Sequence, residues 1–372
     1  MTAESFIPKQ QAPLAGKAVS WVSPSNIALV KYWGKYAPQI PANPSLSFTL
    51  NHCKTITKVH LQNLGNTSKP SQAHPNSQDF SFDFSFDGAA KPDFHPKIKA
   101  FFKRVHAYMP FLSQYHFSIE SENTFPHSSG IASSASAMAA LSLCLLELSG
   151  EFNTERSEQQ AAFYEKASFL ARLGSGSAAR SIAGPLVGWG KTKSIPGSND
   201  LSAVLFSSPL AAVFQNYQDT ILLVDKGAKQ VSSTIGHGLM EQHPYAAVRF
   251  AQAHTQIAAL SVAMQEGNME SFIHIVEQEA LTLHAMMLTS SPYFILMKPN
   301  TLAIIEKVWA FRASSAIPLC FTLDAGANVH LLYPEAQRET VLQFIEIELV
   351  VHCENEQYIC DSLGTGSKPV SI

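Results

Sequence analysis

The 372-residue chain lacks the paired-cysteine spacings that mark disulfide frameworks and zinc sites. It also lacks an H-E-x-x-H pattern among its 14 histidines, so we expect no transition-metal site built from protein side chains. Its cysteines stand in apolar or strand-like surroundings, which indicates buried free thiols and a reducing compartment. They are Cys53, Cys144, Cys320, Cys353 and Cys360.

The N-terminus lacks a basic segment that leads into an apolar run, which argues against a secretory signal. The most apolar expected helix, residues 134–148, contains Glu147 and is shorter than the roughly 20 residues that a bilayer span needs. A formal net charge of -3 gives no general attraction for nucleic acid or membranes. We therefore expect a soluble, cytoplasmic protein in which any anion site is local.

A chain of 372 residues exceeds what one hydrophobic core usually organises, so two domains are expected. Both halves mix alternating, strand-like segments with helical ones, which indicates the α+β class. The loop S-I-P-G-S-N-D-L-S is a plausible boundary. We place the first domain at residues 1–197 and the second at residues 198–372.

Local patterns predict the individual elements. In residues 18–30 the turn signal S-P-S-N breaks the strand pattern, and residues 46–50 and 51–62 read as separate strands. The tract F-S-F-D-F-S-F-D-G alternates up to a turn, which predicts a strand with one buried face. Residues 1–17 look like a loose extension. Helices are predicted near residues 96–108, 155–173 (with Thr154 as cap), 245–265, 269–286, 301–312 and 335–349.

The segment P-H-S-S-G-I-A-S-S-A-S-A, residues 126–137, places one glycine and five serines before an apolar helix. The start of a helix leaves backbone N–H groups unpaired and carries about half a positive elementary charge. Gly130 permits a close backbone approach, and Ser133 and Ser134 add hydroxyl donors. The segment is built like a phosphate cradle, although a serine-rich cap on a buried helix explains it equally well. It is no Walker A loop, because the G-K-[ST] ending is missing.

Three more segments combine polar groups with small or apolar residues. In N-I-A-L-V-K-Y-W-G-K the two lysines suit an anionic small molecule, although surface lysines beside a buried tryptophan are the commoner finding. In G-S-G-S-A-A-R, Arg180 can donate two parallel bonds to a carboxylate or form a surface pair at a helix end. Asp324 ends an apolar strand before A-G-A-N, where an aspartate is usually a turn former.

These motifs together resemble one family. P-x-x-x-G-x-A-S-S-A is similar to the phosphate-binding motif of the GHMP small-molecule kinase superfamily. Residues 25–35, 174–181 and 322–333 are similar, in that order, to signatures of the diphosphomevalonate decarboxylases. The resemblance implies an α+β, GHMP-kinase-type two-domain fold with a ribosomal protein S5 domain 2-like N-terminal half and a ferredoxin-like C-terminal half. The active site would lie in the cleft between them.

The resemblance also implies an activity. Members use ATP and Mg²⁺ to phosphorylate the tertiary alcohol of mevalonate 5-diphosphate, which then loses phosphate and carbon dioxide to give isopentenyl diphosphate. A homodimer is implied as well. Three alternatives stay open: a decarboxylase of the monophosphate, a kinase that phosphorylates the 3-hydroxyl without decarboxylation, and a non-catalytic ligand sensor.

Roles for individual residues follow from the same resemblance. Asp324 is implied as the catalytic carboxylate and Arg180 as the ligand of the substrate C1 carboxylate, with Lys31 and Asn26 near the carboxylate and the reacting hydroxyl. The other substrate-binding residues implied are Tyr32, Lys35, Ser175, Gly176, Ser177, Ser233 and Ala325. Those implied for nucleotide binding are Ser129, Gly130, Ala132, Ser133 and Ser134.

The chain departs from the family pattern at several positions. His127, Ser128 and Ser129 stand where threonine and alanines are more usual. Ala327 replaces a proline, and His237 stands where methionine is common. An arginine that many members use on the diphosphate has no clear counterpart between residues 61 and 100, where Lys91 and Lys97 are candidates.

Overall fold

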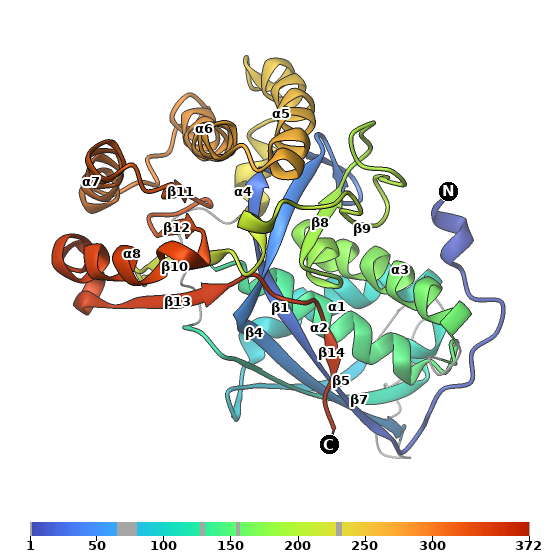
Figure 1. Ribbon diagram of the computed structural model, residues 1–372. Coiled ribbons are helices and arrows are strands. Elements are labelled where there is room, and N and C mark those ends of the chain that lie inside the picture. The colour runs from blue at the N-terminus through green and yellow to red at the C-terminus, as the bar shows by residue number, and fades with distance from the viewer. Residues whose placement is uncertain (1, 65–79, 127–130, 154–156, 228–232, 372) are drawn as a thin grey trace.

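A computed structural model describes residues 2–64, 80–126, 131–153, 157–227 and 233–371. A large sheet with helices on one face occupies one side of the molecule, and a smaller sheet with its own helices occupies the other (Figure 1). Helices and strands occur in both halves of the chain, so the predicted α+β class is confirmed.

The large sheet has the strand order β14-β1-β4-β7-β5-β6, and β8 pairs with both β4 and β9. Most neighbours are antiparallel, whereas β5 and β7 are parallel. The last strand, β14, returns from the C-terminus to pair with β1. The strands are β1 (Ala18–Val30), β4 (Ser45–Asn63), β5 (Ser81–Phe86), β6 (Ala89–Ala90), β7 (Tyr115–Asn123), β8 (Leu186–Trp189), β9 (Val204–Leu205) and β14 (Lys368–Pro369).

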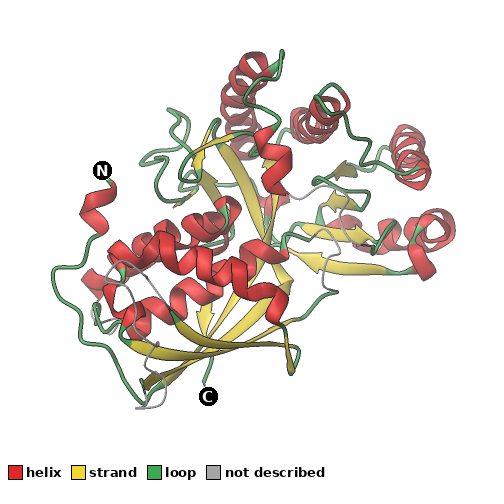
Figure 2. Ribbon diagram, turned by 180° about the vertical axis from the view of Figure 1, so that it is seen from behind, coloured by secondary structure: helices red, strands yellow, loops and turns green. Residues whose placement is uncertain are grey.

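Three helices cover one face of this sheet: α1 (His95–Val105), α2 (Ser133–Leu148) and α3 (Ser157–Gly174) (Figure 2). Helix α2 is buried along nearly its whole length, because it packs against β1 and β4 on one side and α3 on the other. This burial explains why its sequence is apolar all round rather than amphipathic. The predicted cap of α3, Thr154, lies outside the described residues.

The smaller sheet has the order β11-β12-β10-β13. The first strand in the chain, β10, lies between the third and the fourth, which is the ferredoxin-like arrangement. Its strands are β10 (Gln218–Leu222), β11 (Cys320–Thr322), β12 (Val329–Tyr333) and β13 (Tyr358–Ser362). The helices of this half are α4 (Ser233–Gly238), α5 (Ala246–Glu266), α6 (Met269–Leu288), α7 (Pro299–Ser315) and α8 (Arg338–Phe344).

Two strand predictions were wrong in the same way. S-P-S-N does not break the first strand: β1 continues through it, with a register shift between Pro24 and Asn26. A bulge tolerates proline because one residue there needs no ladder hydrogen bond. The two strands predicted between residues 46 and 62 are likewise one strand, β4, whose N-terminal part pairs with β8 and whose C-terminal part pairs with β7.

The N-terminal extension is docked rather than loose. Phe6 is buried and stacks on Phe169 with ring centroids 4.1 Å apart. The Ala12 N–H donates to the Ser149 carbonyl at 3.1 Å. Gly150 makes this contact possible, because its φ is +61° and a Cβ there would lie 2.0 Å from the Ala12 oxygen.

All five cysteines are free, as predicted, although Cys360 is exposed rather than buried. None of the described helices combines the length and the apolar composition that crossing a bilayer requires.

Asp361 of β13 joins the smaller sheet to β4 of the large one. One carboxylate oxygen accepts hydrogen bonds from the backbone N–H groups of Asn51 and His52, both at 2.8 Å. The other accepts from Cys53 N–H at 2.7 Å. Asp361 is 2% exposed, so its carboxylate depends on these backbone N–H groups in place of water.

Asp361→Ala should lower the free energy of unfolding by about 3 kcal/mol or more, because it removes the acceptor of these three N–H groups and of the Ser362 N–H. Urea unfolding, followed by circular dichroism, measures the change. Asp93→Ala, at an exposed position, is the matched control and should shift the midpoint little. Equal midpoints for the two variants would show that this junction contributes no stability.

Candidate active site

The candidate site lies where the two sheets meet. Lys31 directly follows β1, which runs from the large sheet toward α4 (Figure 1). Asp324 follows β11 of the smaller sheet. The Lys31 Nζ lies 3.3 Å from the Asp324 Oδ1, so each half of the protein supplies one member of this ion pair.

Lys31 is nearly inaccessible to solvent, whereas the Asp324 side chain is 29% exposed. Burial lowers the pKa of Lys31, and the carboxylates of Asp324 and then Glu279 oppose that shift. Arg180 lowers the Lys31 pKa further, so the two cations are close enough to repel each other. A ligand can therefore reach the carboxylate of the pair while the ammonium stays behind it.

Arg180 belongs to the 3-10 helix η5 (Gly176–Ser181) and is buried. Its guanidinium donates to the Ser47 and Ser45 hydroxyls, each at 2.6 Å. Burial lowers the Arg180 pKa to about 10, while Asp324 opposes the shift. Within the described residues no carboxylate lies at ion-pair distance from Arg180, and a buried cation of this kind favours an anionic ligand.

Asn26 and Ser175 connect the other predicted segments to this site. The Asn26 amide donates to the Ser177 carbonyl at 3.2 Å and to the Ser181 hydroxyl at 2.8 Å, so β1 holds η5 in place. The hydroxyls of Ser175 and Ser134 lie 3.4 Å apart. The glycine-rich segment therefore adjoins the start of α2, as a shared anion site requires.

Tyr32 is buried against the Trp189 ring, with centroids 4.7 Å apart. Its hydroxyl is buried, and no described residue hydrogen-bonds to it. Burial raises the pKa of Tyr32, so the hydroxyl keeps its proton. A hydroxyl that has a proton to donate and lacks a partner is suited to a ligand oxygen.

Lys35 lies in β2 (Lys35–Tyr36), which forms a short hairpin with β3 (Ile40–Pro41). Partial burial lowers the Lys35 pKa, and the nearby Arg104 of α1 lowers it further. The sequence analysis missed Arg104, because helical periodicity places it on the polar side of α1 without showing what that side faces. The structure thus supplies an arginine near Lys35 outside the range searched for one.

His237 in α4 is buried between two aromatic rings. Its ring centroid lies 4.1 Å from that of Tyr32 and 4.9 Å from that of Trp33. Nδ1 accepts the Gly34 N–H at 3.0 Å, so the neutral ring carries its proton on Nε2. Burial, with Lys35 and Arg180 adding smaller effects, lowers the His237 pKa to about 3.

Part of the predicted phosphate segment lies outside the described residues, namely Ser129 and Gly130. Ala132 precedes α2 with a φ of 43°, and Ser133 begins the helix. Ser233 begins α4. Ala325 packs beside Trp33 and the buried methionines around it.

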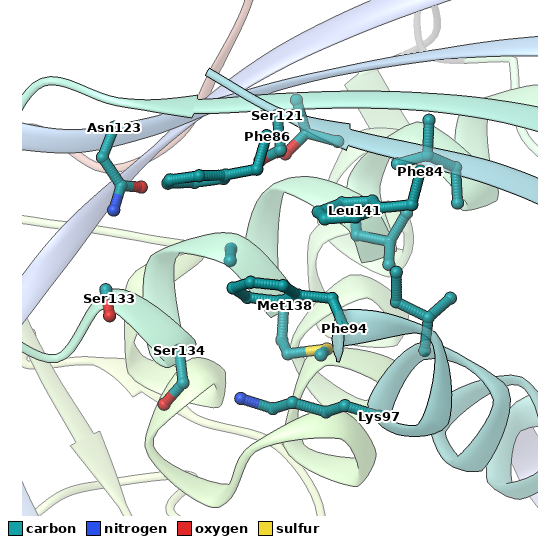
Figure 3. Close-up of a pocket in the computed structure, with 14 residues that line it drawn as sticks. Phe84, Phe86, Phe94, Lys97, Ser121, Asn123, Ser133, Ser134, Met138 and Leu141 are labelled. Carbon is teal, nitrogen blue, oxygen red and sulfur yellow. The ribbon is translucent and has the colours of Figure 1, made fainter. Parts of the chain in front are cut away.

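A pocket adjoins the start of α2 (Figure 3). Ser133 and Ser134 line one end of it, and Lys97 extends from α1 toward Ser134. The Asn123 Oδ1 accepts from the Thr55 hydroxyl at 2.7 Å, but its buried Nδ2 has no partner among the described residues. The remaining lining is largely apolar and includes Phe84, Phe86, Phe94, Met138 and Leu141.

The sequence analysis did not find this pocket. It predicted that the phenylalanine tract forms a strand with one buried face, and β5 confirms the strand. Phe84 and Phe86 of that strand line the pocket, where Phe86 and Phe94 stack with centroids 5.8 Å apart. Lys97, a candidate for the missing diphosphate ligand, lines this pocket as well.

Gly176→Ala should destabilise the protein, because a Cβ at residue 176 would lie 2.6 Å from the Tyr32 hydroxyl oxygen. Relieving that clash moves the Tyr32 ring relative to Trp189, at a cost of about 1–3 kcal/mol. Thermal unfolding and tryptophan fluorescence measure the two effects. Gly238→Ala is the matched control, since a Cβ there meets no atom within 4 Å. Two alanine variants with the same melting temperature would contradict this packing.

The chain was compared with known proteins. Residues 23–202 match a domain family described as "Diphosphomevalonate decarboxylase-like N-terminal domain". Residues 220–368 match one described as "Mevalonate 5-diphosphate decarboxylase C-terminal domain". The diphosphomevalonate decarboxylase of Candida albicans is 30% identical over 334 residues, covering 88% of this chain and 87% of the relative. The human one is 26% identical over 355 residues, covering 90% and 80%.

Solved structures show the same relationship. The mevalonate diphosphate decarboxylase from Staphylococcus aureus matches with a TM-score of 0.78 at 25% identity, covering 95% of this chain and 98% of the other. The enzyme from Enterococcus faecalis matches with a TM-score of 0.77 at 26% identity, covering 95% and 99%. A third match, with a TM-score of 0.77 at 26% identity and coverage of 95% and 99%, is described as a complex with MVAPP, AMPPCP and magnesium.

The predicted GHMP-type two-domain fold is confirmed by these structural matches. The motifs around Lys31, Arg180 and Asp324 indicate the same family as the two domain descriptions, the Candida relative and the structural matches. The chain therefore belongs to the diphosphomevalonate decarboxylase family.

Proposed function

We propose that the protein catalyses the ATP-dependent decarboxylation of mevalonate 5-diphosphate to isopentenyl diphosphate, with release of ADP, phosphate and carbon dioxide. The observation that carries this proposal is the contact between Lys31 and the partly exposed Asp324, beside the buried Arg180. One reachable carboxylate and two buried cations suit a substrate that must lose a proton while its anionic groups are held.

Asp324 is the group that orients the 3-hydroxyl and takes its proton as the oxygen attacks the γ-phosphorus of ATP. The Lys31 Nζ donates to the Asp324 Oδ1 at 3.3 Å and so fixes the direction in which this carboxylate faces. Phosphoryl transfer depends mainly on positioning and on charge stabilisation. Lys31 supplies both, because it is fixed by burial and lies beside the reacting oxygen.

Arg180 holds the C1 carboxylate, and Asn26 keeps Arg180 in place through η5. Once the 3-phosphate has formed, the electron pair of the C1–C2 bond becomes the C2–C3 double bond. The C3–O bond breaks, its electron pair leaves with the phosphate, and C1 departs as carbon dioxide. A planar guanidinium fixes the orientation of C1 and so decides which bond breaks.

The substrate diphosphate binds near Tyr32 and Lys35. The unpartnered Tyr32 hydroxyl and the Lys35 ammonium are its donors, together with Ser175, Gly176, Ser177, Ser233 and Ala325 of the neighbouring segments. Arg104 lies near enough to Lys35 to contribute a second cation. We propose that Arg104 acts as the diphosphate-binding arginine, for which residues 61–100 offer no clear counterpart.

The nucleotide lies with its phosphates at the start of α2 and its base in the adjacent pocket. Ser129, Gly130, Ala132, Ser133 and Ser134 contact the phosphates, and the apolar pocket accommodates a purine. The unpartnered Asn123 Nδ2 donates to a ring nitrogen of the base.

Mg²⁺ fits this arrangement as a companion of the triphosphate. Among the described residues no three His, Cys, Asp or Glu side chains are grouped so as to hold a metal ion. Mg²⁺ usually keeps several waters and binds through substrate phosphates and few protein oxygens, such as the Ser133 and Ser134 hydroxyls. When bound, it supplies charge neutralisation to the phosphates.

We also propose that the two domains meet at residue 197, that the protein forms a homodimer and that it is located in the cytoplasm. The two domain matches, which end at residue 202 and resume at residue 220, support a boundary in this region. Strands β9 and β14 both follow residue 197 in the chain, yet both pair within the large sheet. The second predicted domain therefore contributes its first and its last strand to the sheet of the first domain.

Purified protein with MgATP and mevalonate 5-diphosphate should release ADP, phosphate and carbon dioxide in equal amounts. Asp324→Asn should lower kcat by about 10³-fold, because the amide keeps the shape but cannot take a proton. The three products are followed together in a coupled assay. ADP without carbon dioxide would indicate a plain 3-kinase, and preferred turnover of the monophosphate would indicate the other decarboxylase. Nucleotide binding without turnover would indicate a sensor.

Asn123→Asp should raise the KM for ATP about 10-fold, because it removes the donor to the base while keeping an acceptor for the Thr55 hydroxyl. The KM for the diphosphate should stay near that of the wild type, since Asn123 lines only the base pocket. Initial rates with each substrate varied in turn give both constants. An unchanged KM for ATP would place the base elsewhere.

A further inference from the structure

A buried ion pair from the C-terminal half holds the main chain of Lys31. Glu279 of α6 and Arg249 of α5 are fully buried and lie 2.7 Å apart. The Lys31 N–H donates to the Glu279 Oε2 at 2.9 Å, and the Lys31 carbonyl accepts from the Arg249 Nη2 at 3.0 Å. The pair thus binds both backbone polar groups of this one residue.

Helix α6 also holds the partner of Lys31. His284 lies five positions after Glu279 on α6, and its Nε2 donates to the Asp324 carbonyl oxygen at 3.1 Å. Burial lowers the pKa of His284 to about 4, so the ring is neutral and its Nε2 can carry the proton that this bond requires. One rigid helix therefore fixes the backbone at both ends of the Lys31–Asp324 contact.

We infer that Arg249 and Glu279 are positioning residues for catalysis, which hold the backbone of Lys31 so that its ammonium lies beside Asp324. This inference rests on the function proposed above. The Glu279 carboxylate acts on Lys31 in two ways, through the hydrogen bond to its backbone and through its negative charge.

The charges around Lys31 make this dependence measurable. Removing the Glu279 charge leaves the buried ammonium with one carboxylate neighbour instead of two, so the pKa of Lys31 falls further. Activity then fails at lower pH as Lys31 loses its proton. The groups that face Lys31 are Asp324 after β11, Glu279 and His284 on α6, Arg180 on η5 and Arg249 on α5.

The test compares two double variants. Arg249→Met with Glu279→Leu removes both charges and leaves neither partner buried alone, a replacement that folded proteins often tolerate. We expect kcat/KM to fall about 10²-fold. In the pH profile of kcat/KM, the decrease on the alkaline side (the basic limb) should occur at lower pH. Arg312→Met with Glu277→Leu removes a different ion pair, in which Arg312 of α7 lies 2.6 Å from Glu277 of α6. This pair does not touch Lys31. This control should keep the limb of the wild type.

A single variant, Glu279→Gln, gives a second reading, because it keeps an oxygen that can accept the Lys31 N–H but removes the charge. It should move the basic limb to lower pH with a smaller loss of rate than the double variant. A folded Arg249→Met/Glu279→Leu protein with the rate and pH profile of the wild type would overturn the inference.

The pKa of Lys31 itself separates this inference from the proposed function. It is measured by NMR of ¹³C-lysine-labelled protein, with the resonance assigned through Lys31→Met. If the wild type does not turn over mevalonate diphosphate, the proposed function fails, while a lower Lys31 pKa in the Glu279 variants still supports the positioning role. An unchanged Lys31 pKa in a folded Glu279→Gln protein contradicts that role whatever the activity.

Discussion

The site depends on burying positive charge where the two halves meet. Lys31 and Arg180 are almost completely shielded from water, and Asp324 is the carboxylate that both of them sense. Burial costs a cation its hydration, and the cost is recovered only through anions or hydrogen bonds placed close by. The Ser45 and Ser47 hydroxyls and the Asp324 carboxylate recover part of it here. The remainder favours a ligand that carries several negative charges, so the burial of these cations also selects the substrate.

This constraint explains why the junction between the halves is so firmly made. An ion pair whose members come from different sheets keeps its geometry only if the sheets keep theirs. Asp361 holds β13 to the backbone of β4, and β14 carries the C-terminus back to β1. The Arg249–Glu279 pair reaches across the same junction to Lys31, the residue that follows β1. The contacts that stabilise the fold are therefore also those that align Lys31 with Asp324.

The sequence was most informative where chemistry is local. Ordered motifs predicted the fold family, and they named Lys31, Arg180 and Asp324, which the structure brings to one place. Periodicity predicted most helices to within a few residues, as for α5 and α6. It misjudged β1, because S-P-S-N forms a turn in most settings and a bulge only when neighbouring strands hold the chain extended.

Residues that matter through distant contacts had no local signal. Arg104 and Asn123 lie on elements whose own patterns are ordinary, and their neighbours come from far along the chain. Glu279 reads as a charged residue in a helix, yet it is fully buried because its partners are Arg249 and the backbone of Lys31. A sequence shows which side chains are charged, but only tertiary packing decides which charges lose their water.

His237 shows how the site tolerates a departure from the family pattern. Imidazole usually titrates near neutral pH, and a second proton there would add a cation beside Lys35 and Arg180. Burial and those two cations hold the ring neutral, and the Gly34 N–H fixes which nitrogen carries the proton. A neutral aromatic ring stacked on Tyr32 and Trp33 fills the space of an apolar side chain. Histidine is accommodated where methionine is common because burial, with a smaller effect of the surrounding cations, keeps the ring from taking up a second proton.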